Sequence, residues 1–179
     1  MQARRDQKKI EEILRSYLSL KYQLVGVKVI KCESRVSSSQ PHTPIAFCHM
    51  IRKAAANRES FLYGLDFEKC PTAQIVLGFR EPRYKVDYAA LSPTTRRVSI
   101  SSLSESRYLP DVVLTILTPK QMMDLTIILQ AERNEPLLAL FRGQSSCADF
   151  FAKPYVEGKP NISLPVSYTH LRAHETGRN

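Results

Sequence analysis

The sequence predicts an α/β fold, a single-domain mixed β-sheet with packed helices, and an α+β arrangement as its variant. Segments with helical periodicity alternate along the chain with short segments that read as strands. Some neighbouring strands are joined by short loops, which favours a mixed sheet over a strictly parallel, doubly wound one. A length of 179 residues is also close to the common size of one domain.

Composition narrows the class of protein. Apolar residues make up 43% and charged residues 24% of the chain, as in ordinary globular proteins. No apolar stretch is long enough to cross a bilayer, and the first residues form no secretory signal. Four cysteines in such a context argue against a disulfide framework. We therefore expect a soluble cytoplasmic protein without a membrane span.

The net charge of +9 is spread along the chain. Neither an arginine-rich block nor a stripe of alternating aromatic and basic residues is present, so nucleic acid is not the expected ligand. The sequence identifies no partner, and a redox partner and a small-molecule ligand are the two candidates.

The last residues differ from the rest of the chain. The segment "VSYTHLRAHETGRN", residues 166–179, has no apolar periodicity. It resembles the conceptual translation of a transposase-type sequencing adapter, which reads V-S-Y-T-H-L-R-A-H-E-T in one frame. We therefore interpret 166–179 as a non-native tail that contributes little to stability. His170 and His174 are accordingly not proposed as metal ligands, and native residues beyond Pro165 are expected to be missing.

The first half of the chain predicts two helices and two strands. Apolar residues at helical spacing predict a helix over residues 3–20, and the alternation in "QLVGVKVIK" predicts a strand within 23–31. Thr43 is the expected N-cap of a second helix, because Pro44 suits a first helical position. "SFLYGL" reads as a second strand.

The middle of the chain predicts a further helix and strand. Pro71 after Cys70 indicates a helix start, and Gly78 indicates its end. "RRVSISSL" alternates clearly and predicts a strand. Residues 112–117 form a nearly continuous apolar run, which predicts a central strand buried on both faces.

A strong helix signal follows that run. Thr118, Pro119 and Gln121 form a capping-box pattern for a helix that ends near Arg133. We expect this helix to pack on the sheet through Leu125, Ile128 and Leu129. "LLALF" and "NISL" then read as extended segments on either side of a short capped helix in "SSCADFFAK".

Four motifs in this order resemble the uncharacterised ArCR family, domain of unknown function 169. They are "AFCHMIRKAA", "CPTAQIVLGF", "LPDVVLTILTPKQMM" and "CADFFAKPYVEGKPNISLP". The resemblance covers about residues 20–165 and implies a prokaryotic family with no established activity. It also implies that residues 1–165 are a single domain, truncated at its C-terminus because family sequences continue further.

Three cysteines are the candidate site. Cys48, Cys70 and Cys147 each fall near a predicted helix N-terminus, where the helix dipole stabilises a thiolate and lowers its pKa. They are the predicted cofactor-binding and metal-ligating residues, with an iron–sulfur cluster as the expected cofactor and zinc as the lesser option. Three ligands leave one position for His49, a missing residue, a substrate or a partner. Cys32 shares none of these features.

Other interpretations stay open. Each cysteine can be a small buried apolar residue. A catalytic cysteine would need a base, and only His42 and His49 remain; no catalytic residue is assigned, and whether the protein is an enzyme is left open. The alternative to metal is a small-molecule or anion-binding module in which Lys120, Gln121 and Arg52 contact the ligand.

Overall fold

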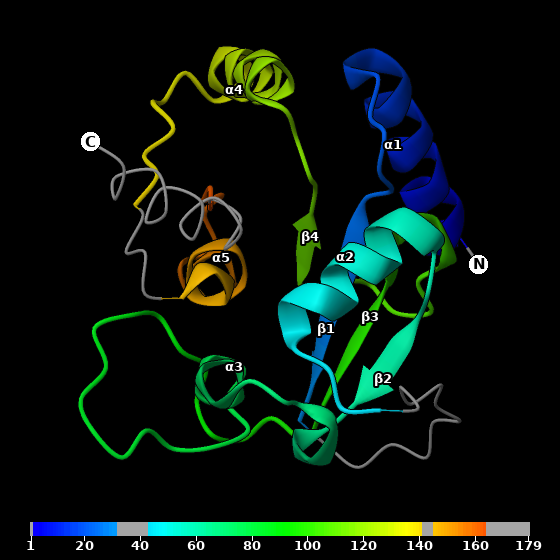
Figure 1. Cartoon of the computed structure of the whole chain (residues 1–179). Helices are drawn as coiled ribbons and strands as arrows, with labels where there is room; N and C mark the ends of the chain where they lie inside the picture. The colour runs from blue at the N-terminus through cyan, green and yellow to red at the C-terminus, as the bar shows by residue number, and fades with distance from the viewer. Residues whose placement is uncertain (1, 32–42, 141–144, 164–179) are drawn as a thin grey trace, which may run out of the picture.

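The computed structural model describes residues 2–31, 43–140 and 145–163. Within them, helices and a four-stranded sheet form one mixed fold, which confirms the predicted class (Figure 1). Predictions for Cys32, His42 and the tail over 166–179 lie outside the described residues, so they stay predictions. Among the described helices, none is both long enough and apolar enough to cross a membrane.

The sheet is antiparallel, as in the α+β variant. Its strands are β1 (Val25–Ile30), β2 (Phe61–Tyr63), β3 (Arg97–Ser102) and β4 (Val112–Leu114), in the order β2-β3-β1-β4. Val27 of β1 pairs with Ile100 on one side and with Val112 on the other. The predicted strands around "QLVGVKVIK", "SFLYGL" and "RRVSISSL" are thus confirmed.

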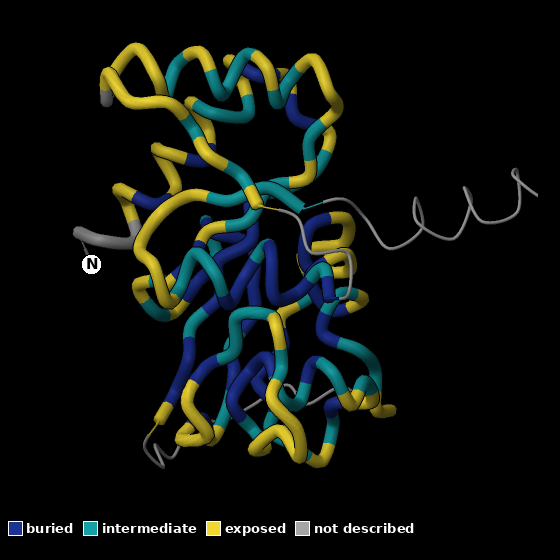
Figure 2. The backbone as a smooth tube through the Cα atoms, turned by 90° about the vertical axis from the view of Figure 1, so that its left-hand side faces the viewer, coloured by how far each residue is buried: buried dark blue, intermediate teal, exposed yellow. Residues whose placement is uncertain are grey.

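The main core lies between the sheet and the helices at its centre. Helix α2 (Phe47–Asn57) buries Phe47, Met50 and Ala54 completely against apolar side chains of β1 and β3. Helix α3 (Pro71–Val76) and the helical run over 146–157 add Val76 and Phe151 to the same core. Figure 2 shows the buried segments gathered in this central part.

Two longer helices form a second, smaller core. Helix α1 (Gln2–Leu18) and helix α4 (Pro119–Arg133) lie side by side at one end of the molecule (Figure 1). Leu18 is buried there with Leu20, Leu24 and Leu103, and Leu125 packs against this cluster.

The prediction for residues 112–117 is wrong. β4 has three residues, lies at the edge of the sheet, and leaves Val113 46% and Ile116 38% exposed. An apolar run indicates a strand, but it does not determine whether that strand is paired on one side or on both sides in the sheet. Nor does α4 pack on the sheet as expected: Leu125 contacts the second core, while Ile128 and Leu129 are only half-buried.

Two helix predictions are confirmed and one start is corrected. α3 begins at Pro71 with Cys70 as N-cap, and α4 has Thr118 as N-cap in a complete capping box. α2 begins at Phe47, not after Thr43, because Ile45 forms a parallel bridge with Glu68.

The end of the described chain also differs from the prediction. Residues 137–140 of "LLALF" and 161–163 of "NISL" form no strand. The short helix in "SSCADFFAK" is present, but it contains a π-helical segment, Ala148–Ala152, before α5 (Lys153–Glu157). Pro154 lacks an N–H, and in a regular α-helix its ring would crowd the carbonyl group four residues earlier. The π-helical segment before it has a wider turn, which relieves this crowding.

Candidate cysteine site

Two helices begin side by side. The parallel bridge between Ile45 and Glu68 aligns the segments before α2 and α3, and the Ile45 amide donates to the Phe67 carbonyl at 3.2 Å. α2 then begins at Phe47 and α3 at Pro71. The N-termini of the two helices are therefore neighbours, although they are more than twenty residues apart in sequence.

A single buried carboxylate joins these two helix starts. Glu68 is 3% exposed, and its Oε1 accepts hydrogen bonds from the amides of Phe47 at 3.3 Å and Cys70 at 2.9 Å. Its Oε2 accepts from the hydroxyl of Tyr63 at 3.3 Å. Neither N-cap residue, Ala46 or Cys70, makes a side-chain capping bond, so Glu68 satisfies amides that would otherwise lack a partner. Burial raises the pKa of Glu68, and these hydrogen bonds oppose that rise.

All three candidate cysteines lie at helix starts, as predicted. Cys48 is the second residue of α2, closer to its start than expected, and Cys70 is the N-cap of α3. Cys147 is the second residue of the helical run over 146–157, where the Ser145 hydroxyl accepts from the Ala148 amide at 3.4 Å. Ser145 therefore acts as an N-cap for that run.

Aromatic packing brings the third helix to the first. The ring of Phe47, at the start of α2, lies 5.2 Å from that of Phe151 and 5.7 Å from that of Phe150, centroid to centroid. Ring contacts of this kind stabilise a fold by more than the burial of their apolar area alone. They hold the start of the 146–157 run, with Cys147, close to the start of α2.

The three thiols lie within electrostatic reach of one another. Burial is the main cause that raises the pKa of Cys48, and the neighbouring Cys70 is the next. Burial raises the pKa of Cys147 to about 12, opposed by its hydrogen bond with Ser145 and reinforced by Cys70, Cys48 and Glu68. The three helix starts that carry these cysteines therefore lie in one region of the fold.

The expected lowering of the thiol pKa is wrong for Cys48 and Cys147. Both lie at helix N-termini, but removal from water disfavours the thiolate by more than the helix dipole favours it. Cys147 is 9% exposed, and its Sγ lies 3.1 Å from the Ser145 hydroxyl oxygen. Burial therefore favours the neutral thiol form of Cys147.

Three residues near the cysteines were not found from the sequence. Tyr63 is fully buried beside Glu68, and its pKa is raised by burial and then by the Glu68 charge. Tyr88 comes from the irregular segment after α3; burial raises its pKa first, followed by Cys147 and Cys70. The two tyrosines belong to no recognisable sequence motif. The role of Glu68 depends on its bridge with Ile45, a long-range contact that the sequence does not reveal.

The cysteines are free thiols and do not form a preformed mononuclear site. Cys48 and Cys70 are half-buried, and Cys147 is buried. Across residues 2–31, 43–140 and 145–163, no group of three or more His, Cys, Asp or Glu side chains is arranged to hold a metal ion. His49, considered as a fourth ligand or a base, is exposed on α2.

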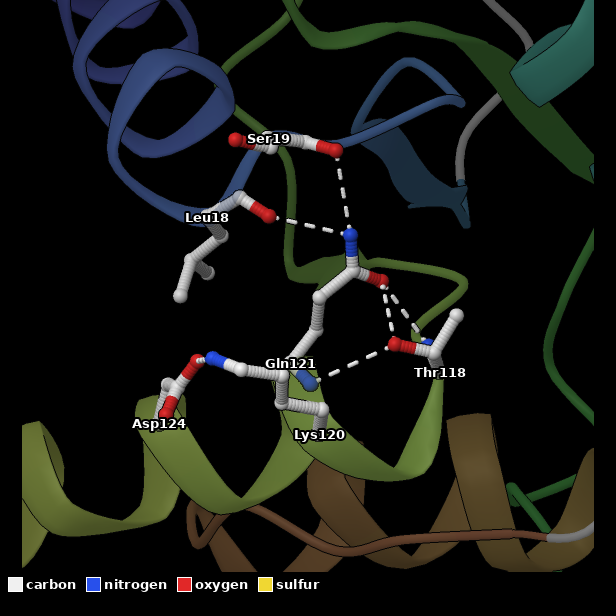
Figure 3. Close-up of polar contacts among 6 residues, drawn as sticks. All are labelled: Leu18, Ser19, Thr118, Lys120, Gln121 and Asp124. Carbon is white, nitrogen blue, oxygen red and sulfur yellow. Dashed lines mark hydrogen bonds and ion pairs between the residues drawn. The ribbon is translucent and has the colours of Figure 1, made fainter.

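The residues of the predicted anion site make other contacts (Figure 3). Gln121 accepts from the Thr118 amide at 2.9 Å and donates to the carbonyl oxygens of Leu18 at 2.9 Å and Ser19 at 3.1 Å. Lys120 pairs with Asp124 at 2.9 Å. Gln121 thus links the start of α4 to the end of α1. Arg52 is an exposed residue of α2.

Comparisons with known proteins identify the family. No significant match was found among curated proteins or among solved structures. The family model described as uncharacterised ArCR, a domain of unknown function, matches residues 13–91 and 85–173. The second match ends within the segment interpreted as a non-native tail, so the boundary at residue 165 stays a prediction. The two matches together span most of the chain, and the protein belongs to the uncharacterised ArCR family.

Proposed function

We propose that this protein binds an iron–sulfur cluster through Cys48, Cys70 and Cys147, in a redox or cofactor-related role. The observation that supports the proposal is that three free thiols lie at three helix starts, which the bridge between Ile45 and Glu68 and the ring contacts of Phe47 bring together. Cysteine thiolates are the usual ligands of such clusters. A fourth position would be taken by a group outside these three residues.

We prefer a cluster to a single zinc ion as the candidate cofactor. Structural zinc sites are compact and use four protein ligands about 2.0 to 2.3 Å from the metal. The described side chains include no group of three ligands arranged around one ion. A cluster of several atoms joins sulfurs that lie further apart than the ligands of a single ion do.

Backbone groups at the start of α2 favour the charged form of the Cys48 thiol. Burial is the main cause that raises the pKa of the Cys48 thiol, and the backbone groups of His49 and Cys48 act in the opposite direction. Hydrogen bonds from amides to cluster sulfurs are one of the means by which proteins tune a cluster. Ligation of Cys147 must release a proton that burial holds strongly, so binding should strengthen as pH rises.

The test is anaerobic purification and reconstitution with ferrous iron and sulfide. We expect iron and acid-labile sulfide to remain bound after desalting, with broad absorption near about 400 nm from sulfur-to-iron charge transfer. A protein that retains zinc but no sulfide would contradict the cluster and favour a mononuclear site. A colourless, metal-free protein that a small molecule stabilises would favour the binding-module alternative.

A further inference from the structure

We infer that Glu68 is the positioning residue of this site: its carboxylate joins the starts of α2 and α3 so that Cys48 and Cys70 act as a pair of thiols toward a thiophilic ligand. The inference deepens the proposed function, and it rests on that function only for the identity of the ligand. The pairing of the two thiols can be measured without any cluster.

One oxygen atom connects the two helices. The amides of Phe47 and Cys70 both donate to Oε1 of Glu68, at 3.3 and 2.9 Å. Cys48 directly follows the first of these residues, and Cys70 is itself the second. The position of each thiol relative to the other therefore depends on a single acceptor, together with the bridge between Ile45 and Glu68.

Glu68 is itself fixed from two sides. Its Oε2 accepts from the hydroxyl of the fully buried Tyr63, and its backbone carbonyl accepts from the Gln74 side chain at 2.7 Å. Gln74 lies on α3, so Glu68 binds the start of that helix through its backbone carbonyl as well as through its side chain. These contacts fix the position of the carboxylate. The carboxylate in turn fixes the positions of the two helix starts that donate to it.

Substitutions at Glu68 separate geometry from charge. Glu68→Gln keeps a side-chain carbonyl oxygen that can accept from both amides, and its NH₂ group can donate to Tyr63. Glu68→Ala removes the acceptor and leaves two amides without a partner. Glu68→Asp keeps the charge but shortens the reach by one methylene, so it should fail to hold both amides together.

The chain offers a matched control in Glu11. This carboxylate is 2% exposed and also accepts two backbone amides, from Leu24 at 3.2 Å and Ser104 at 2.7 Å. It joins α1 to the segments beside β1 and β3, in the region of the second core. Glu11→Ala therefore imposes a similar loss of buried hydrogen bonds without touching the cysteine pair.

The experiment uses phenylarsine oxide as a probe of paired thiols, on the full chain with Cys32 and Cys147 replaced by serine. Two thiols displace the oxide oxygen as water and form two arsenic–sulfur bonds, with no change of oxidation state. We expect one equivalent to bind when Glu68 is present or replaced by Gln. The apparent affinity should fall by at least about tenfold in Glu68→Ala and Glu68→Asp, as loss of a hydrogen bond to a buried charged group implies.

The controls decide between positioning and general stability. Glu11→Ala should bind the arsenical as the parent does, while Cys48→Ser and Cys70→Ser should each abolish the bridging adduct. Equal binding by parent and Glu68→Asp, or an equal loss in Glu11→Ala, would overturn the inference. If Glu68→Ala does not fold, the Gln and Asp variants still give the comparison.

A second readout links the pair to the proposed cluster. In the chain that retains Cys147 and Cys32, cluster absorption after reconstitution should survive Glu68→Gln and Glu11→Ala and be lost in Glu68→Asp. Paired thiols without any cluster in the parent protein would refute the proposed function and leave the positioning role standing. A cluster unaffected by Glu68→Asp would refute the positioning role alone.

Discussion

Gly78 shows how one residue allows a segment to return to the site. Its φ is +71°, a left-handed conformation, and a Cβ at this position would meet the backbone carbonyl oxygen of Ser92. The Thr95 amide also donates to the Gly78 carbonyl at 3.2 Å, and the Leu91 amide donates to that of Val76 at 3.0 Å. The segment that carries Tyr88 is therefore closed against α3 at a place where only glycine fits.

Gly78→Ala should destabilise the protein strongly. The left-handed conformation and the clash with Ser92 together should cost more than about 2 kcal/mol of unfolding free energy. Gly158 is the control, because its φ is +67° but a Cβ there meets nothing within 4 Å, so Gly158→Ala should cost only about 1 kcal/mol. Urea denaturation of both variants measures the difference, and equal losses would show that Ser92 does not approach Gly78 closely.

The buried thiol of Cys147 predicts a pH dependence of protein stability. Its pKa is raised from an ordinary value of 9.0 to about 12, so the folded state keeps a proton that the unfolded state loses. This group leaves stability unchanged below about pH 9, and stability falls above it by up to about 1.4 kcal/mol per pH unit. Cys147→Ala should reduce that slope between pH 9 and 10.5 in urea denaturation. Parallel curves for the two proteins would show that the thiol is not held neutral.

At the scale of elements, the local sequence predicts the bounds of helix α4 almost to the residue but does not predict what α4 packs against. Local pattern determines the start of α4, because Thr118, Pro119 and Gln121 act within one turn. Its packing depends on where β4 lies in the sheet, which the apolar run over 112–117 does not specify. None of residues 119–132 is fully buried.

Gln121 should matter more than the cap residue itself. Thr118→Ala removes one side of the capping box and should cost about 1 kcal/mol of unfolding free energy. Gln121→Ala also leaves the Leu18 and Ser19 carbonyls without that donor, so it should cost more than Thr118→Ala. Lys120→Ala, which removes only an exposed ion pair, should leave the melting temperature nearly unchanged. Gln121→Ala no more harmful than Lys120→Ala would contradict the link between α4 and α1.

At the scale of the whole molecule, helix starts could be read from sequence, but their convergence could not. The predicted helix N-termini select Cys48, Cys70 and Cys147, and each lies at the start of a helix. The bridge between Ile45 and Glu68, and the ring contacts of Phe47, bring those starts together. Both are contacts between distant parts of the chain, so no local spacing records them.

The same long-range contacts reverse the electrostatic expectation. A helix start taken alone predicts a lowered thiol pKa, whereas the assembled core removes Cys147 from water and raises it to about 12. Burial is a property of the whole fold. The sequence could therefore indicate which thiols to examine, but not the protonation state in which the folded protein holds them.

The most direct test of a single three-cysteine site is the iron content of four serine variants after anaerobic reconstitution. Cys48→Ser, Cys70→Ser and Cys147→Ser should each lose iron and sulfide together, although Cys147 is 77 residues beyond Cys70 in the chain. Cys32→Ser should retain the content of the parent protein. If Cys147→Ser keeps full iron while Cys48→Ser and Cys70→Ser lose it, or if all four variants behave alike, the three cysteines do not form one site.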